Sequence, residues 1–238
     1  MQVIQNLDPG KVMQELFPKL MGSALRMVLL VTIVSFILAI LIGFILALGK
    51  VSHSKVLHGI IGFFQEIIRG TPLLVQLIYI YYVFPLLIEI FAYWFGNPDY
   101  NCRISSTVAG IIGLSINYGF YISEVIRSAI ESIDRGQTEA ALALGFSPRQ
   151  AMFKVVIPQA TRQSIPVFGN YLMTLVKDTS LMAYITAPEL LQTTQAYISQ
   201  TFTTIESYTL VAIIYLVISM LLAALLKLVE RKMSRSKR

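Results

Sequence analysis

Long stretches without a charged side chain are the feature of this sequence that most restricts its fold. Four of them are clear: Met27–Leu48, Gly70–Ile88, Ile104–Ser123 and Ser207–Leu226. About 20 helical residues cross the ~30 Å hydrocarbon core of a bilayer. A helix also satisfies its own backbone hydrogen bonds there. Charged residues make up only 13% of the chain, about half of the ~25% typical of soluble domains. These observations predict an all-α integral membrane protein.

A fifth span is less regular. Gln163–Val176 is uncharged, Lys177 and Asp178 follow it, and Thr179–Pro188 is uncharged again. A charge at membrane depth costs about 2.5–3.5 kcal/mol on insertion scales, so such a span should face other helices rather than lipid. We therefore predict one transmembrane domain, residues 1–238, with five transmembrane helices near 22–48, 60–92, 104–126, 163–187 and 207–228.

The distribution of Lys and Arg predicts the orientation of these spans. With the N-terminus outside, the cytoplasmic segments 49–58, 127–162 and 227–238 hold thirteen of the nineteen basic residues, and the outer segments hold four. The positive-inside rule then favours an N-out/C-in topology. Because the charges flank the spans rather than cluster on one soluble face, we expect no nucleic-acid partner.

Two further features concern processing and redox state. The first apolar run is longer than the core of a signal peptide and lacks a basic segment before it, so we expect it to remain in the mature protein. Cys102 is the only cysteine, which excludes a disulfide within the chain.

The longest cytoplasmic segment, 127–162, contains a predicted pair of short helices. Thr138–Leu144 is rich in the strong helix formers Ala and Leu. Gly145 readily adopts the left-handed backbone conformation that is typical just after the end of a helix. An isolated helix of this length is marginal in water, so the pair needs a partner surface. That surface is either the protein's own membrane helices or a separate soluble protein.

The second helix of the pair has a clear start signal. Ser147 can cap it, Pro148 suits its first turn, and Gln150 completes a capping box. The pattern predicts a helix over Ala151–Ile157 that stops before Pro158.

Polar residues also lie within the predicted spans. Glu66 and Arg69 are three residues apart, as are Glu124 and Arg127, so each pair can meet on one helix face. Pro72 removes a helical hydrogen bond and predicts an interruption of the second span. We assign structural or gating roles to the following residues: Glu66, Arg69, Thr71, Pro72, Arg127 and Lys177.

Several of these segments resemble a known family. Glu139-Ala140-Ala141, Gly145 and Ile157-Pro158 match the outline of the EAA motif of ABC importer permeases. Three further segments look like signatures of the polar amino-acid permeases, which include histidine, arginine, glutamine and cystine systems: Arg69–Gln76, Tyr121–Arg127 and Lys177–Leu181. The resemblance covers roughly residues 20–230.

The resemblance implies a type I ABC importer permease fold in a bacterial cell membrane. It implies that loop 127–162 is a coupling loop that docks on an ATPase through Glu139, Ala140, Ala141, Leu144, Gly145, Phe146 and Ser147. The implied partners are two copies of the ATPase, a second permease (identical or homologous), an extracellular solute-binding protein and membrane lipid. The implied cargo is a polar amino acid, with L-cystine slightly favoured.

The same resemblance implies that ATP and Mg²⁺ belong to the partner. This chain has no G-x-x-x-x-G-K-[ST] loop for nucleotide phosphates, so we predict that it is not itself an enzyme. No His/Cys cluster suggests a metal site.

A mid-membrane pocket is the predicted site for the amino acid. Asn117, Tyr121 and Glu124 share one face of the third span, and we group them with Asp178, Thr179 and Ser180. The ammonium group needs an acceptor, such as Glu124 or Asp178, and the carboxylate needs donors, such as amides, hydroxyls or free backbone N–H groups. Polar packing between helices is the alternative interpretation of these residues.

Two other classes of protein stay open at this point. An ion-coupled secondary transporter or channel would use Glu124 and Asp178 as proton or ion sites, and its uptake would survive loss of any ATPase. A membrane scaffold without transport would leave the polar spans unexplained.

Overall fold

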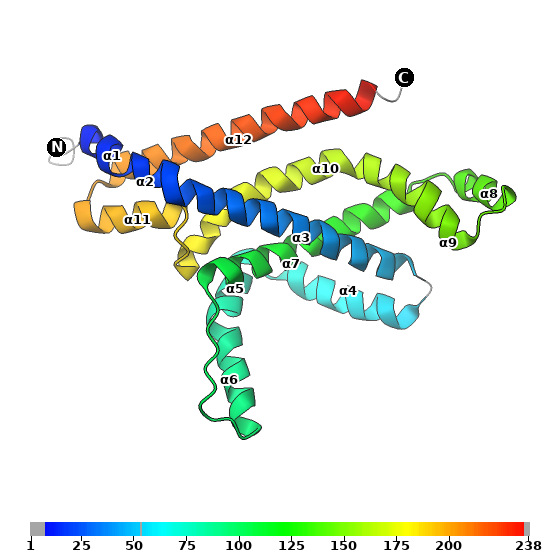
Figure 1. Cartoon of the computed structure of the whole chain (residues 1–238), viewed down its shortest axis with the longest axis horizontal. Coiled ribbons are helices and arrows are strands. Elements are labelled where there is room, and N and C mark those ends of the chain that lie inside the picture. Colours follow the sequence, from blue (N-terminus) through cyan, green and yellow to red (C-terminus); the bar gives the residue numbers. More distant parts are fainter. Residues whose placement is uncertain (1–7, 53, 236–238) are drawn as a thin grey trace. The chain divides into compact units, whose positions relative to one another are not determined.

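The structure, a computed structural model, describes residues 8–52 and 54–235, in which all regular secondary structure is helical. Residues 1–7 lie outside the described residues. So do Lys237 and Arg238, two of the basic residues that were counted for the predicted orientation. The helical segments, labelled in Figure 1, are α1 Pro9–Glu15, α2 Phe17–Lys19, η2 Leu20–Ala24, α3 Leu25–Val51, α4 Lys55–Gly70, α5 Leu73–Ile78, η3 Tyr79–Val83, α6 Phe84–Trp94, α7 Ser106–Glu131, α8 Arg135–Ala143, α9 Pro148–Ala151, η4 Met152–Val156, α10 Ile157–Asp178, η5 Thr179–Ile185, α11 Leu190–Thr201 and α12 Thr204–Arg235.

The chain forms two compact units, each assembled from three separate stretches of sequence. Unit 1 comprises Met1–Phe36, Thr71–Leu114 and Met173–Leu225, and unit 2 comprises Ile37–Gly70, Ser115–Leu172 and Leu226–Arg238. Helices α3, α7, α10 and α12 each contribute residues to both units.

The core of unit 1 is built around one stripe of the first helical segments. Every fourth residue from Val12 to Val28 is at most 2% exposed, the spacing that places residues on one helix face. This stripe shares a buried cluster with Val176, Leu190, Tyr197, Val211 and Ile214. Residues 8–20, to which the sequence assigned no role, therefore belong to the core of this unit.

A close crossing of α3 and α7 organises unit 2. A Cβ added at Gly43 would lie 2.6 Å from Ile122 Cγ2 and 3.0 Å from the carbonyl oxygen of Gly119. A Cβ added at Gly119 would lie 2.7 Å from Ile42 Cγ2. Small residues allow this approach, as is common between membrane helices.

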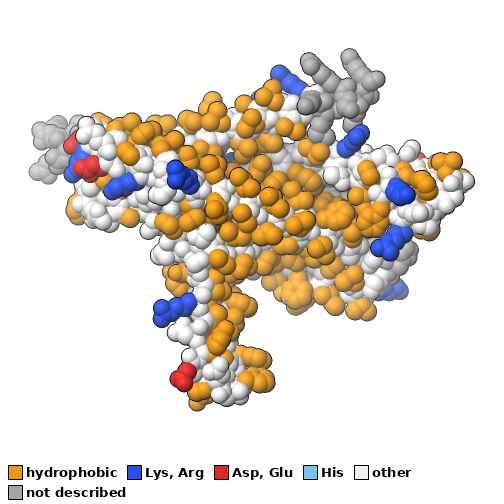
Figure 2. Space-filling model, in the orientation of Figure 1, with side chains coloured by type: hydrophobic (Ala, Val, Ile, Leu, Met, Phe, Trp, Pro, Cys, Tyr) orange, Lys and Arg blue, Asp and Glu red, His pale blue; other side chains and the backbone are white. Residues whose placement is uncertain are grey.

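The opposite face of α3 is apolar and exposed. Ile33, Ile37, Leu41 and Ile45 recur every four residues and are 54–68% exposed. Figure 2 shows hydrophobic side chains spread widely over the visible face. A continuous apolar surface of this kind is costly in water but suits lipid.

Four helices of the described chain are long and apolar enough to cross a membrane: Pro9–Val51, Leu73–Trp94, Ser106–Glu131 and Thr204–Arg231. They correspond to four of the predicted spans. The count of five and the N-out/C-in orientation remain predictions.

The interruption predicted in the second span is present. Helix α4 ends at Gly70 and α5 begins at Leu73. The Nε2 of Gln76 donates to the hydroxyl (2.9 Å) and the carbonyl (3.1 Å) of Thr71. The predicted segment 60–92 therefore contains two separate helical stretches, of which Leu73–Trp94 alone is long and apolar enough to cross a membrane.

The irregular fifth segment is also interrupted where the charges suggested. Helix α10 ends at Asp178, and the tighter 3₁₀ turn η5 follows from Thr179. Thr179 is buried there, and its hydroxyl donates to the carbonyl of Val176 at 2.7 Å.

Candidate functional site

The predicted pair of short cytoplasmic helices is present as the hairpin of α8 and α9 (Figure 1), although α8 begins at Arg135, before the predicted Thr138. Helix α8 is capped by Asp134, whose side chain accepts from the N–H of Gly136 at 2.7 Å. It ends at Ala143, and Gly145, two residues later, has φ +84°. The N–H of Gly145 donates to Leu142 O (2.9 Å) and that of Phe146 to Ala141 O (3.1 Å). These bonds form a Schellman motif, the standard glycine-dependent end of a helix.

The capping box predicted for the second helix is formed. The N–H of Gln150 donates to Ser147 Oγ (3.3 Å), and the N–H of Ser147 donates to Gln150 Oε1 (2.9 Å). Pro148 occupies the first turn. The two caps on either side of the turn fix its geometry through local bonds alone.

The predicted end of this helix before Pro158 is wrong. The chain stays helical from Pro148 to Asp178 through α9, η4 and α10. Met152–Val156 is a wider π-turn, in which the N–H of Ile157 donates to Met152 O, five residues back. Pro158 follows as the second residue of α10, where its missing N–H is tolerated.

The hairpin leaves apolar side chains on its surface. Leu144 is 80% exposed, Leu142 42% and Phe153 46%. Glu139, Ala140, Gly145 and Ser147 are also exposed. Two residues of the predicted coupling set differ from that picture: Ala141 is buried within the hairpin, and Phe146 is half-buried.

The second half of the hairpin is basic and aromatic. The guanidinium of Arg149 lies over the ring of Phe153 (6.0 Å), and the ammonium of Lys154 lies over the ring of Phe146 (5.6 Å). With Ser147 and Gln150, three of these side chains line a shallow hollow of about 280 Å³. The hairpin therefore presents an exposed leucine tip beside a positively charged, aromatic surface.

A network of charged groups lies at the end of unit 2 where α3, α4 and α7 meet. The predicted Glu124–Arg127 pair is formed, with Arg127 Nε donating to Glu124 Oε1 at 3.0 Å. Lys50 Nζ lies 3.2 Å from Glu124 Oε2 and also bonds to Gln65. Arg127 reaches Glu131 at 2.7 Å. The network ties three helices together through one carboxylate.

The companion pair, Glu66 with Arg69, is not formed. None of the three ion pairs within residues 8–52 and 54–235 includes either residue. The guanidinium of Arg69 instead lies over the ring of Tyr121 at 5.4 Å.

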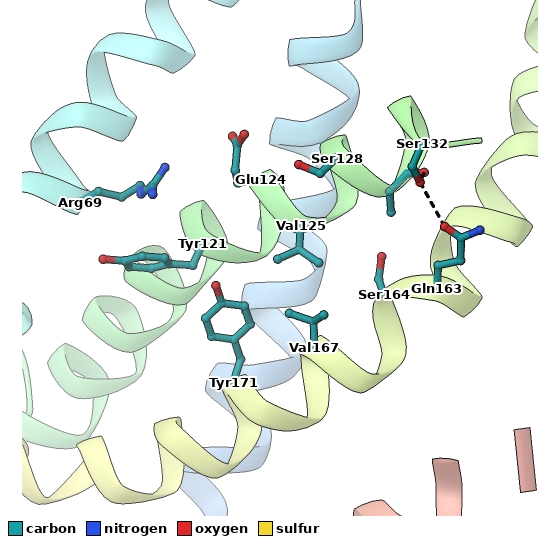
Figure 3. A pocket seen from close by; sticks show the side chains of 11 residues that line it. Arg69, Tyr121, Glu124, Val125, Ser128, Ser132, Gln163, Ser164, Val167 and Tyr171 are labelled. Atoms are coloured by element: carbon teal, nitrogen blue, oxygen red, sulfur yellow. Dashed lines mark hydrogen bonds between the residues drawn. The ribbon is translucent and has the colours of Figure 1, made fainter. Parts of the chain in front are cut away.

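Arg69 stands on the wall of a cavity of about 410 Å³ in unit 2, which we call the Arg69 cavity (Figure 3). Helix α7 supplies Tyr121, Glu124 and Ser128 to it, and α10 supplies Gln163 and Tyr171 among others. The rings of Tyr121 and Tyr171 are 6.1 Å apart, and Ser132 Oγ donates to Gln163 Oε1 at 3.1 Å.

The predicted substrate residues are divided between the two units. Tyr121 and Glu124 line the Arg69 cavity, and Asn117 is buried one turn earlier on α7. Asp178, Thr179 and Ser180 belong to unit 1, at the change from α10 to η5. Lys177 beside them is exposed. Their predicted grouping with the α7 residues stays a prediction.

Two polar residues of these sites, and the residue that caps α11, were given no role by the sequence. Gln65 is uncharged and gave no signal, although it is 5% exposed and bonded to Lys50. Tyr171 resembled any tyrosine of an apolar helix. Glu189 caps α11 by accepting from the N–H groups of Leu191 (2.8 Å) and Gln192 (2.7 Å). Its position after Pro188 and before an apolar helix was a usable start signal.

Comparison with protein families gives a match over residues 39–235. The matching family is described as "Binding-protein-dependent transport system inner membrane component". The match includes α4, α7, the hairpin, α10 and α12, and therefore both sites described above.

Individual relatives are similar over nearly the whole chain. The L-cystine transport system permease protein TcyB of Bacillus subtilis is 33% identical, covering 95% of this chain and 92% of the relative. The glutamine transport system permease protein GlnP of Escherichia coli is 32% identical, covering 87% and 90%.

Solved structures share the fold. A chain of a crystal structure described as an amino acid ABC transporter with histidines is 31% identical, with a TM-score of 0.80 over 95% of this chain and 99% of that one. A chain of the inward-facing MetNI methionine ABC transporter has a TM-score of 0.70 at 20% identity, covering 92% and 98%.

Proposed function

Since the chain belongs to the family of binding-protein-dependent transport system inner membrane components, we propose that it is the transmembrane subunit of an ATP-driven amino-acid uptake system. It forms the translocation path in the bacterial inner membrane and couples it to a separate ATPase. Cystine and glutamine are the amino acids named for two of its relatives. Of these we favour L-cystine as the cargo.

The observation that carries the proposal is the α8–α9 hairpin. Its two helices are fixed by a Schellman motif and a capping box, yet its tip residue Leu144 is 80% exposed. A short helix pair that is built so firmly around an exposed apolar side chain suits a surface that docks on another protein. We propose that Glu139, Ala140, Leu144, Gly145 and Ser147 make this contact with the ATPase.

The rest of the complex follows from the family. Two copies of the ATPase, which binds ATP and Mg²⁺, act with two permease chains and an extracellular solute-binding protein. ATP binding shifts the permease between outward- and inward-open states only as far as it binds one state more tightly than the other. The hairpin transmits that difference through α10, since the helix is continuous from Pro148 to Asp178.

Within the path, we propose that Asn117 and Tyr121 contact the amino acid and that Glu124 forms the floor of that pocket. We propose separately that Asp178, Thr179 and Ser180 contact it. Asn117→Ala or Asp178→Ala should then abolish uptake while the ATPase stays assembled. Normal uptake by both variants would favour polar packing between helices instead.

The decisive experiment reconstitutes this chain in vesicles with the ATPase and binding protein encoded near it. Uptake of labelled L-cystine and L-glutamine is measured with ATP, with a non-hydrolysable ATP analogue, and with imposed proton or sodium gradients. We expect uptake of at least one amino acid with hydrolysable ATP only. Uptake that follows an ion gradient without ATP would establish the secondary transporter instead.

A further inference from the structure

We propose that the guanidinium of Arg69 binds the carboxylate of the transported amino acid inside the Arg69 cavity. The inference rests on the proposed function for the identity of the ligand. The preference of the cavity for an anion is inferred from the geometry of unit 2 alone. The inference assigns a direct role in cargo binding to a residue that the sequence placed among structural or gating groups.

Arg69 places a positive charge on the wall of this cavity. Its side chain is held over the ring of Tyr121, with 5.4 Å between the guanidinium carbon and the ring centroid. It takes part in none of the ion pairs of residues 8–52 and 54–235. An aromatic face orients a guanidinium without neutralising it, and the donor edge stays available to a ligand.

Glu124, although it lines the same cavity, does not neutralise it. Arg127 donates to Oε1 of this carboxylate (3.0 Å), and Lys50 and Gln65 donate to Oε2 (3.2 and 3.4 Å). With Glu131, which also pairs with Arg127, the network holds two cations and two carboxylates and is neutral. The charge of Arg69 therefore gives the cavity a net positive charge.

The rest of the cavity lining also suits a carboxylate. Figure 3 shows the Tyr171 side chain rising from α10 with its hydroxyl directed towards α7, on the side where Tyr121 and Val125 lie. Ser128 adds a second hydroxyl, and Val125 and Val167 add apolar surface. Hydroxyl donors beside a guanidinium suit a carboxylate, which an Arg side chain binds through two parallel hydrogen bonds. A volume of about 410 Å³ accommodates an amino acid.

The ligand that we propose for the Arg69 cavity is thus an amino-acid carboxylate. A phospholipid phosphate offers the same anionic oxygens from the surrounding membrane, so the experiment must separate the two sources. The ammonium acceptor is not Glu124, because its oxygens are already engaged by Arg127, Lys50 and Gln65.

The test places a reporter thiol in the cavity. Ser128→Cys is introduced in a Cys102→Ala background, and the complete complex is studied in nanodiscs of phosphatidylcholine. The thiol is modified with methanethiosulfonate reagents that carry either a sulfonate or a trimethylammonium group, and each rate is normalised to that of a free thiol. We expect the sulfonate reagent to react about tenfold faster, the scale of electrostatic focusing in a charged cleft.

Matched variants assign that preference to Arg69. Arg69→Gln should reduce the rate ratio to about one. Arg26→Gln removes the same charge from an exposed residue of unit 1 and should leave the ratio unchanged. Arg69→Lys keeps the charge without the planar donor edge, so it should keep the ratio and lose most protection by amino acids. An unchanged ratio in Arg69→Gln overturns the proposal, and so does a wild-type ratio near one.

Protection identifies the ligand. L-glutamine and L-cystathionine, a thioether analogue of cystine, are compared with their decarboxylated amines. We expect at least one amino acid to slow modification several-fold, its amine to fail, and Arg69→Gln to abolish the effect. Protection by the amines, or by neither amino acid, overturns the assignment. If thiol modification is slowed only by a change to phosphatidylglycerol nanodiscs, with no amino acid added, the site binds a lipid headgroup and the assignment is also overturned. Uptake measured in parallel tests the proposed function separately, because the reagent preference does not require transport.

Discussion

Gly145→Val isolates the contribution of one backbone conformation to coupling. Gly145 has φ +84°, in the left-handed region, and a Cβ placed there would meet no atom within 4 Å. Overlap of the Cβ with the rest of the chain therefore contributes nothing, and within the chain the cost of valine lies in the backbone. For a residue with a side chain this conformation costs about 1–2 kcal/mol, and it is most unfavourable for β-branched residues.

The consequence should appear in binding of the ATPase. If the hairpin must adopt its observed turn to dock, 1–2 kcal/mol weakens the complex by a factor of about 5–30. Binding of the purified ATPase to the variant in nanodiscs, titrated at equilibrium, measures this factor. Correct insertion of the variant is checked by its yield and its thermal unfolding temperature.

Gly145→Asn is the matched control, because asparagine tolerates the left-handed region far better than valine. It adds a side chain of similar bulk, and we expect it to bind the ATPase within about threefold of the unmodified chain. Two results would refute the reasoning: equal binding by Gly145→Val and the unmodified chain, or an asparagine variant as weak as the valine variant.

Two of the remaining predictions concern stability, and the third concerns topology. Glu189→Ala removes the carboxylate that accepts from two N–H groups at the start of α11, and it leaves the half-buried Tyr215, whose hydroxyl is 2.8 Å from that carboxylate, without this partner. We expect a loss of about 1–3 kcal/mol, measured as a lower unfolding temperature in detergent, and no change for the exposed control Glu230→Ala. Gly43→Val forces a Cβ to 2.6 Å from Ile122 and should destabilise unit 2 by about 1–3 kcal/mol. The control Gly62→Val, with no atom within 4 Å of its added Cβ, should cost far less. Equal unfolding temperatures of the two variants would contradict the close crossing of α3 and α7. For the topology, an impermeant thiol reagent should label Cys102 from outside intact cells and a reporter fused after Arg238 should read as cytoplasmic; labelling of Cys102 only after permeabilisation would argue against the N-out orientation.

The sequence by itself determined features that depend on neighbouring residues. Charge-free runs gave the apolar helices, because crossing hydrocarbon depends on length and composition alone. Gly145 and the Ser147–Gln150 box gave both caps of the hairpin, since each uses bonds between residues at most five apart. Gly70–Pro72 gave the break in the second span for the same reason. The pairing of Glu124 with Arg127 was also within reach of one helix face.

Tertiary structure decided what depends on contacts between distant segments. Lys50 and Gln65 reach Glu124 from 74 and 59 residues away, so no local pattern could assign this carboxylate three partners. Glu66 and Arg69 have the same spacing as Glu124 and Arg127, yet they form no ion pair with each other, and the guanidinium of Arg69 lies over the ring of Tyr121 on another helix instead. Pro158 reads as a helix end, but the π-turn before it lets the helix continue, and that turn has no clear sequence signal. The guanidinium of Arg69 therefore faces a cavity instead of the carboxylate of Glu66 on its own helix. Only the packing of α4 against α7 could produce this arrangement.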